Sequence, residues 1–205
     1  MRTILLTCCL FMGTILSAQN NVLIEIENAN AAYKVITGDF VRTQTNVAKG
    51  TSIKADGTLY IVGEDQMAQY YKAPSTDLLI INGNDFYMIR GKKTNKFNTE
   101  KNKTMRSLRN TLLYCVHGKP MELATENGAE ITAEKKENEY EVVLISTKKT
   151  ARGYAKIVLT YDLKSKLLTK MRMDEYNGNS TLYEMNNLKT NGNIDAKVFD
   201  IPEKK

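Results

Sequence analysis

The densest hydrophobic pattern in the chain lies in residues 57–89, where short apolar stretches alternate with turn signals. Apolar side chains occupy both the odd and the even positions of these stretches, so both faces of each expected strand are hydrophobic. The proline of Ala73-Pro74 ends one strand, because proline cannot donate to a ladder. Residues 77–81, the turn Asn82-Gly83 and residues 86–89 then predict a β-hairpin. Three or four antiparallel strands are expected here, and both of their faces must be shielded from water.

Helical periodicity is clearest in residues 105–117. Its apolar stripe recurs at helical spacing and consists of Met105, Leu108, Leu112, Leu113 and Val116. Gly118 and Pro120 predict the end of this helix. Weaker patterns predict an N-terminal helix over residues 20–32 and a short helical turn over residues 121–127.

The remainder of the chain has the pattern of strands and turns. One strand is predicted over residues 33–45, and four more are predicted after Gly128, over residues 139–146, 154–163, 167–176 and 180–188. Turn signals stand at residues 49–50 and 55–57. Residues 91–104 are polar and predict a long loop or a mobile edge. A last short strand is predicted over residues 198–201. The pattern indicates a mainly β, α+β fold: a large meandering antiparallel sheet with two or three short helices.

The N-terminus has the pattern of an export signal. Arg2 precedes an apolar run over residues 3–16, which is shorter than the ~20 residues of a membrane-spanning helix. Leu16-Ser17-Ala18 resembles a cleavage site, so residues 1–18 are predicted to be a cleaved signal peptide and residues 19–205 a single exported domain. Cys8 does not have the small residue before it that lipidation requires, which favours a soluble exported product.

Composition narrows the function classes. A formal net charge of +6 comes from lysines and arginines that are scattered along the chain. No basic cluster is interleaved with aromatic residues, so nucleic-acid binding is not expected.

Catalytic constellations are also missing from the sequence. His117 is the only histidine and, after cleavage, Cys115 is the only cysteine, which excludes the usual zinc sites and Cys/His pairs. His117 is expected to be exposed or to cap a helix, and Cys115 to be a small buried hydrophobe. The carboxylates of Glu64-Asp65 and Asp174-Glu175 point to opposite faces if they lie on strands. We expect no enzyme, cofactor or metal, although the fold could still bring two distant carboxylates together.

Because nucleic-acid binding and the usual catalytic sites are not expected, the remaining class of function is ligand binding. A curved sheet with an apolar concave face, closed by the helix that carries Met105, Leu108 and Leu112, would enclose a lipid-sized cavity. An ordinary hydrophobic core is the alternative interpretation of the same pattern.

The order of the motifs resembles one family. Its most specific parts are Gly57-x-Leu59-Tyr60, residues 67–74, the Asn82-Gly83 turn with Tyr87 beyond it, and Phe199 followed by Ile201-Pro202. Over essentially the whole exported chain this arrangement resembles the LolA family of periplasmic lipoprotein carriers.

The resemblance implies an open, curved antiparallel half-barrel with about three short helices as a lid. Its cavity would hold the acyl chains of lipoproteins, received from an inner-membrane lipoprotein-releasing transporter and passed to an outer-membrane acceptor by a monomeric, periplasmic protein. The candidate cavity-lining residues are Leu59, Ile61, Tyr71, Leu79, Ile81 and Met88 from the sheet, with Leu108 and Leu112 from the lid. Met67 is expected on the loop that docks the membrane partner.

One departure from the family pattern concerns the lid. The family usually has an Arg-Pro pair after the strand that begins at Gly57, where the arginine holds the lid shut, and this chain has Gly63-Glu64 instead. Arg106, Arg109 and Arg152 are candidate substitutes. A carrier of glycolipid or phospholipid, a lipid-responsive sensor domain of the same fold, and an enzyme with an unrecognised carboxylate pair remain as alternatives.

Overall fold

The computed structural model describes residues 21–148 and 153–201, so the predicted signal peptide over residues 1–18 and Arg152 lie outside the described residues. The strands are β1 (Val35–Asn46), β2 (Thr51–Val62), β3 (Gln66–Tyr71), β4 (Leu78–Asn82), β5 (Asp85–Arg90), β6 (Lys93–Asn98), β7 (Ala129–Lys135), β8 (Glu139–Ser146), β9 (Tyr154–Asp162), β10 (Leu168–Glu175) and β11 (Ser180–Thr190). The helices are α1 (21–31), α2 (Lys103–Val116), α3 (Pro120–Asn127) and the 3₁₀ helix η1 (Ala196–Phe199).

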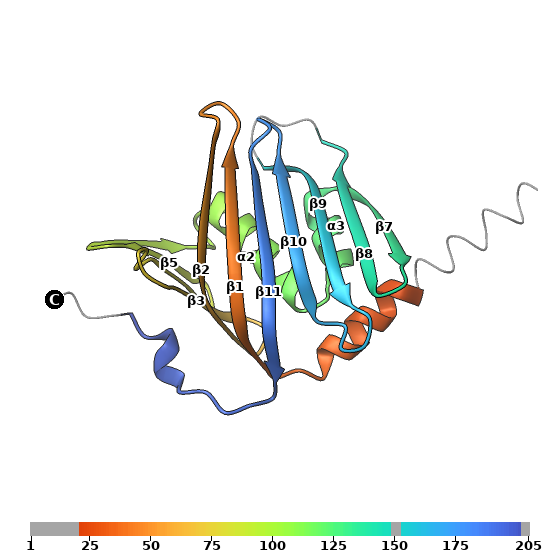
Figure 1. Cartoon of the computed structure of the whole chain (residues 1–205), viewed down its shortest axis with the longest axis horizontal. Coiled ribbons are helices and arrows are strands. Elements are labelled where there is room, and N and C mark those ends of the chain that lie inside the picture. Colours follow the sequence, from red (N-terminus) through yellow and green to blue (C-terminus); the bar gives the residue numbers. More distant parts are fainter. Residues whose placement is uncertain (1–20, 149–152, 202–205) are drawn as a thin grey trace, which may run out of the picture.

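All of these strands form one antiparallel sheet, shown in Figure 1, in the order β6-β5-β4-β3-β2-β1-β11-β10-β9-β8-β7. Neighbouring strands are consecutive in the chain except β1 and β11, which join the two halves. Because β6 and β7 are the two edges, the α2–α3 connection between them has to cross one face of the sheet. Figure 1 shows both helices on that face, which we call the inner face. The sheet does not close into a barrel, which confirms the predicted open α+β half-barrel with three α-helices.

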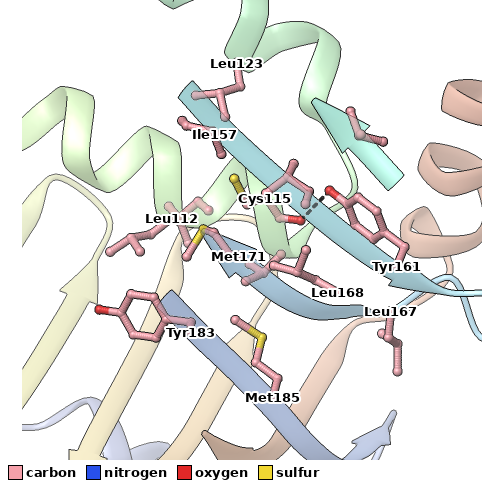
Figure 2. Packing of buried hydrophobic residues seen from close by; sticks show 14 of the residues in the cluster. Leu112, Cys115, Leu123, Ile157, Tyr161, Leu167, Leu168, Met171, Tyr183 and Met185 are labelled. Carbon is pink, nitrogen blue, oxygen red and sulfur yellow. Dashed lines mark hydrogen bonds between the residues drawn. The ribbon is translucent and has the colours of Figure 1, made fainter. Parts of the chain in front are cut away.

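The inner face and the helices share one hydrophobic core. Alternate residues of each strand point into it, among them Leu59 of β2 and Leu159 of β9, which are 1% and 0% exposed. The hydroxyl of Tyr161 donates to the carbonyl of Cys115 at 2.9 Å, as Figure 2 shows, and this bond ties the C-terminal half of α2 to β9. Cys115 is fully buried, which confirms its prediction as a small core residue.

Helix α1 packs at one end of the sheet, where Figure 1 shows it beside β8. Ile26 is fully buried in the inner core. The Asn30 amide donates to the carbonyl of Lys166 at 2.8 Å, and the Tyr33 hydroxyl donates to the carbonyl of Ser165 at 2.9 Å. Both acceptors lie in the β9–β10 turn, so this turn fixes α1 against the sheet.

The opposite, outer face of β3–β5 carries a second hydrophobic cluster. Ala68, Ile80 and Tyr87 face it, and the C-terminal segment covers it with Phe199, which is 6% exposed. The hydroxyl of Tyr70 donates to the carbonyl of Val198 at 2.8 Å. The strand predicted over residues 198–201 is therefore wrong, because this segment folds as η1 over the outer face and pairs with no strand. This cover over the outer face explains why both faces of this part of the sheet are apolar.

Three further differences from the predicted elements have a common cause. β2 begins at Thr51, so residues 55–57 are not a turn and extend the β1–β2 ladder. Residues 93–98 form the edge strand β6 within the expected loop, with Phe97 opposite Phe86. β7 was not among the predicted strands. In each case pairing with a neighbouring strand outweighs a polar local sequence.

Candidate functional site

All of the predicted cavity-lining residues lie in the inner cluster. Leu59, Ile61, Tyr71, Leu79, Ile81 and Met88 point inward from β2 to β5, and Leu108 and Leu112 meet them from α2. The strand parity assumed for each residue is the one that the structure has. Whether these residues bind lipid stays a prediction.

Much of this inner surface is closed in the structure. Ile81 is fully buried, and Leu59, Ile61 and Leu112 are each 1% exposed. The gap between β1, β2, β11, the start of β10 and the C-terminal end of α2 measures only about 10 Å³. The side chains of α2 fill the space between the helix and the inner face of the sheet.

Open volume is found at the N-terminal half of α2. A groove of about 410 Å³ runs between this half-helix and the ends of β9 and β10, which lies within the ~300–1,000 Å³ of small-molecule pockets. Its lining residues are Lys103, Thr104, Met105, Ser107, Leu108, Gly153, Tyr154 and Glu175. A hollow of about 150 Å³ continues from it past Ser107 and Tyr154 to Leu144 and Ile157.

Sequence reasoning missed the half of this groove that β8–β10 contribute. Tyr154 and Ile157 belong to a strand that was predicted, but no motif linked that strand to the residues of α2. The alternation of Ile157, Leu159 and Tyr161 was the available signal, because it gives this strand a continuous inward face.

Met67 does not lie where the docking prediction needs it. It belongs to β3, pairs with Ile61 and Ile81, and is 1% exposed in the inner core. The loop before it ends at Asp65, and the alternation of β3 directs Met67 inward. Its assignment to an exposed docking loop is therefore wrong for this structure.

Two polar contacts hold α2 and its C-terminal end against the β-turns. The Arg109 guanidinium donates from Nε to the carbonyl of Gly83 at 2.8 Å. Lys119 forms an ion pair with Glu64 at 3.0 Å, and this hydrogen bond lowers the pKa of the Glu64 carboxyl. The Glu64 side chain is 81% exposed, so the pair contributes at most about 1 kcal/mol. Of the two candidate arginines among the described residues, Arg109 contacts the β4–β5 turn, while Arg106 is exposed.

His117 is the C-cap residue of α2 and is 8% exposed, so the prediction of capping is confirmed and that of exposure is wrong. Its Nε2 atom is buried without a hydrogen-bond partner among the described residues. Burial lowers its pKa to about 4, and the charge of Lys119 adds to this effect, whereas Glu64 opposes it. The folded protein therefore favours neutral His117.

This burial predicts acid-sensitive stability. The unfolded chain takes up a proton at His117 near pH 6.5, whereas the folded chain does so only near pH 4, so stability falls as the pH drops between these values. The contribution is roughly 3 kcal/mol. We expect urea titrations to show a shallower loss of stability over this range for His117→Gln than for the unmodified protein. Parallel pH profiles would contradict the buried, neutral histidine.

The described part of the chain was predicted to hold no metal site, and its acidic side chains are spread out or paired with basic ones. Over residues 21–148 and 153–201, no three His, Cys, Asp or Glu side chains lie close enough to hold a metal ion. Asp174 is engaged by Arg172, whose Nε donates to it at 2.8 Å. None of the helices in the described residues is long and apolar enough to cross a membrane.

The structure is thus an open antiparallel sheet whose apolar inner face packs against a helix, with a groove beside the N-terminal half of that helix. The chain belongs to the family described as "Outer membrane lipoprotein carrier protein LolA", whose model matches residues 31–202. This confirms the resemblance drawn from the motifs. At the level of the family, the fold is that of a carrier that binds lipids or lipoproteins.

Several solved structures resemble this chain at low sequence identity. A DUF1329 family protein from Desulfovibrio piger is 10% identical with a TM-score of 0.51, over 91% of this chain and 97% of that one. MucB is 12% identical with a TM-score of 0.50, over 92% of this chain and 64% of that one. A LolA superfamily protein from Nitrosomonas europaea is 9% identical with a TM-score of 0.45, over 89% and 97%. No curated protein sequence matches the chain significantly.

Proposed function

We propose that the protein is a periplasmic carrier that shields the acyl chains of lipoproteins and transfers them from the inner to the outer membrane. The observation that carries this proposal is the apolar inner face, which is covered by a helix whose N-terminal half borders an open groove. In this proposal residues 1–18 direct export and residues 19–205 form the carrier domain. The protein acts without catalysis, cofactor or nucleic acid, as a monomer.

Ligand entry follows from how α2 is attached. Its C-terminal half is anchored by the buried bond between Tyr161 and Cys115, whereas Met105 and Leu108 in the N-terminal half are only partly buried. We infer that an acyl chain enters at the groove and displaces this half of the helix. The contact of Arg109 with Gly83 then breaks, and water replaces it at the surface.

The driving force is hydrophobic. A lipoprotein with two or three acyl chains exposes hundreds of square ångströms of apolar surface to water, and its burial gains ~25 cal/mol per Å². Displacing α2 exposes its apolar side chains to water, which offsets part of that gain, so the net affinity is moderate. Moderate affinity suits a carrier, which has to accept cargo from an inner-membrane transporter and release it to an outer-membrane acceptor.

The test is binding of a fluorescent acyl probe to the purified protein. We expect saturable binding that a triacylated lipopeptide displaces, while the same peptide without acyl chains does not. Displacement by phospholipid or glycolipid but not by lipopeptide would identify the alternative cargo classes. A protein that binds none of these ligands would contradict the carrier function.

A further inference from the structure

Three polar side chains stand together on the largely apolar inner face. Gln69 and Tyr71 of β3 are 2% and 9% exposed, and Arg42 of β1 places its guanidinium carbon 4.6 Å from the centre of the Tyr71 ring. Arg42 lies opposite Tyr183 of β11, another residue of the inner core. All of them therefore point toward the space that α2 covers.

The hydrogen bonding of this group is incomplete. Nε of Arg42 is buried without a hydrogen-bond partner, and no carboxylate of the described residues forms an ion pair with its guanidinium. Gln69 has only long contacts, at 3.4 Å from its Oε1 to the Tyr71 hydroxyl and 3.8 Å from its Nε2 to Sδ of Met67. Buried polar groups in proteins are normally satisfied. The Nε–H of Arg42 is thus available for an acceptor that the described residues do not supply.

Arg42 marks a boundary along β1. Two residues toward the buried end, Phe40 is 1% exposed and packs edge-on against Tyr71, with ring centres 5.0 Å apart. Two residues toward the other end, Gln44 is exposed, and its partner on β2, Ile53, is 63% exposed. The guanidinium therefore lies between the solvent-exposed end of the inner face and its apolar interior.

Tyrosines lie both at the groove and next to Arg42. Tyr154 lines the groove, and burial raises its pKa, with a further increase from the nearby Tyr183 hydroxyl. Tyr183 lies opposite Arg42, and it also raises the pKa of Tyr71, which burial raises most. The ring of Phe40 packs against both Tyr71 and Tyr183, so these two tyrosines lie on either side of it, next to Arg42.

We propose that Arg42, with Gln69 and Tyr71, binds the anionic head group of a lipid cargo, a phosphate or a carboxylate, while the acyl chains lie in the apolar interior. This rests on the carrier function proposed above and selects its alternative cargo class, phospholipids and other anionic amphiphiles, because the acylated anchor of a lipoprotein carries no anionic group. Guanidinium groups form strong, charge-assisted bonds with both kinds of anion. The stacking on Tyr71 holds the guanidinium in place, which lowers the entropy lost on binding.

The test compares ligands with the same acyl chains and different head groups. Dioleoyl phosphatidylglycerol is set against dioleoylglycerol, and palmitate against hexadecanol, with inorganic phosphate alone as a further ligand. We expect the unmodified protein to bind each anionic ligand roughly tenfold or more tightly than its neutral counterpart. Inorganic phosphate should not compete, because it lacks the chains.

Arg42→Gln should abolish this preference and leave the affinity for the neutral ligands unchanged, and Arg42→Lys should keep part of it. Arg172→Gln is the matched control, since it removes the same charge from a side chain that is 54% exposed, and it should keep the full preference. Equal affinities for anionic and neutral ligands, or an equal loss for both in Arg42→Gln, would overturn the assignment. A protein that binds no amphiphile at all would instead contradict the carrier function.

Discussion

Replacing Gly57 with alanine is expected to destabilise the fold by about 3 kcal/mol, and replacement with valine should prevent folding. A Cβ atom at this position would lie 2.2 Å from the carbonyl oxygen of Tyr70 and 2.8 Å from the ring of Phe40. Neither can yield, because Tyr70 belongs to the β2–β3 ladder and Phe40 is 1% exposed in the core. Glycine is needed here for close approach in the middle of a paired strand.

Thermal and urea unfolding measure this effect. Gly192→Ala is the matched control, because a Cβ atom there has nothing within 4 Å and the backbone needs no left-handed conformation, so its stability should equal that of the unmodified protein. A Gly57→Ala protein within about 0.5 kcal/mol of the control would contradict the close packing of β1, β2 and β3.

The second large effect concerns two leucines of α2, of which one lies in the core and the other lines the groove. Leu112 is 1% exposed beneath α2, so Leu112→Ala should lower the free energy of unfolding by about 3 kcal/mol. In a chain of this size that loss corresponds to a fall in melting temperature of roughly 6–12 °C. Leu108, one turn earlier, is only partly buried and lines the groove.

Leu108→Asp should therefore keep the fold and weaken binding of an acyl probe by roughly tenfold or more, since the probe would have to bury against a charge. Ile145→Asp places the same charge on a side chain of β8 that is 52% exposed, and it should bind normally. Circular dichroism and probe titration together distinguish the outcomes. If Leu108→Asp unfolds, or binds as well as Ile145→Asp, the groove is not the entry site.

The sequence predicts the parts of the fold that strand alternation and helical spacing encode locally. β8 has the predicted bounds, and α2 begins two residues before the predicted helix. The inward parity of Leu59 to Met88 follows from the same alternation. The side that a residue faces is set by its own strand, so one sequence is enough to predict it.

Other features depend on partners far away in the chain. η1 replaces a predicted strand because the apolar outer face of β3–β5 needs a cover, and no local signal shows which segment supplies it. The local sequence predicts a turn at Gly57. The need for glycine there arises from the ring of Phe40, which the β1–β2 pairing brings against it. The groove wall at Tyr154 and the unpartnered Arg42 likewise appear only once β1, β9 and β11 share a sheet.

The most direct test of the carrier function is native mass spectrometry of the protein purified from a Gram-negative periplasm. We expect the exported chain to carry an acylated species, whose mass separates lipoprotein from phospholipid or glycolipid. The Leu108→Asp protein should carry less of this species, and the Ile145→Asp protein should carry as much as the unmodified protein. A protein that is always recovered empty, and that stays empty when triacylated lipopeptide or phospholipid is added, would contradict the carrier function.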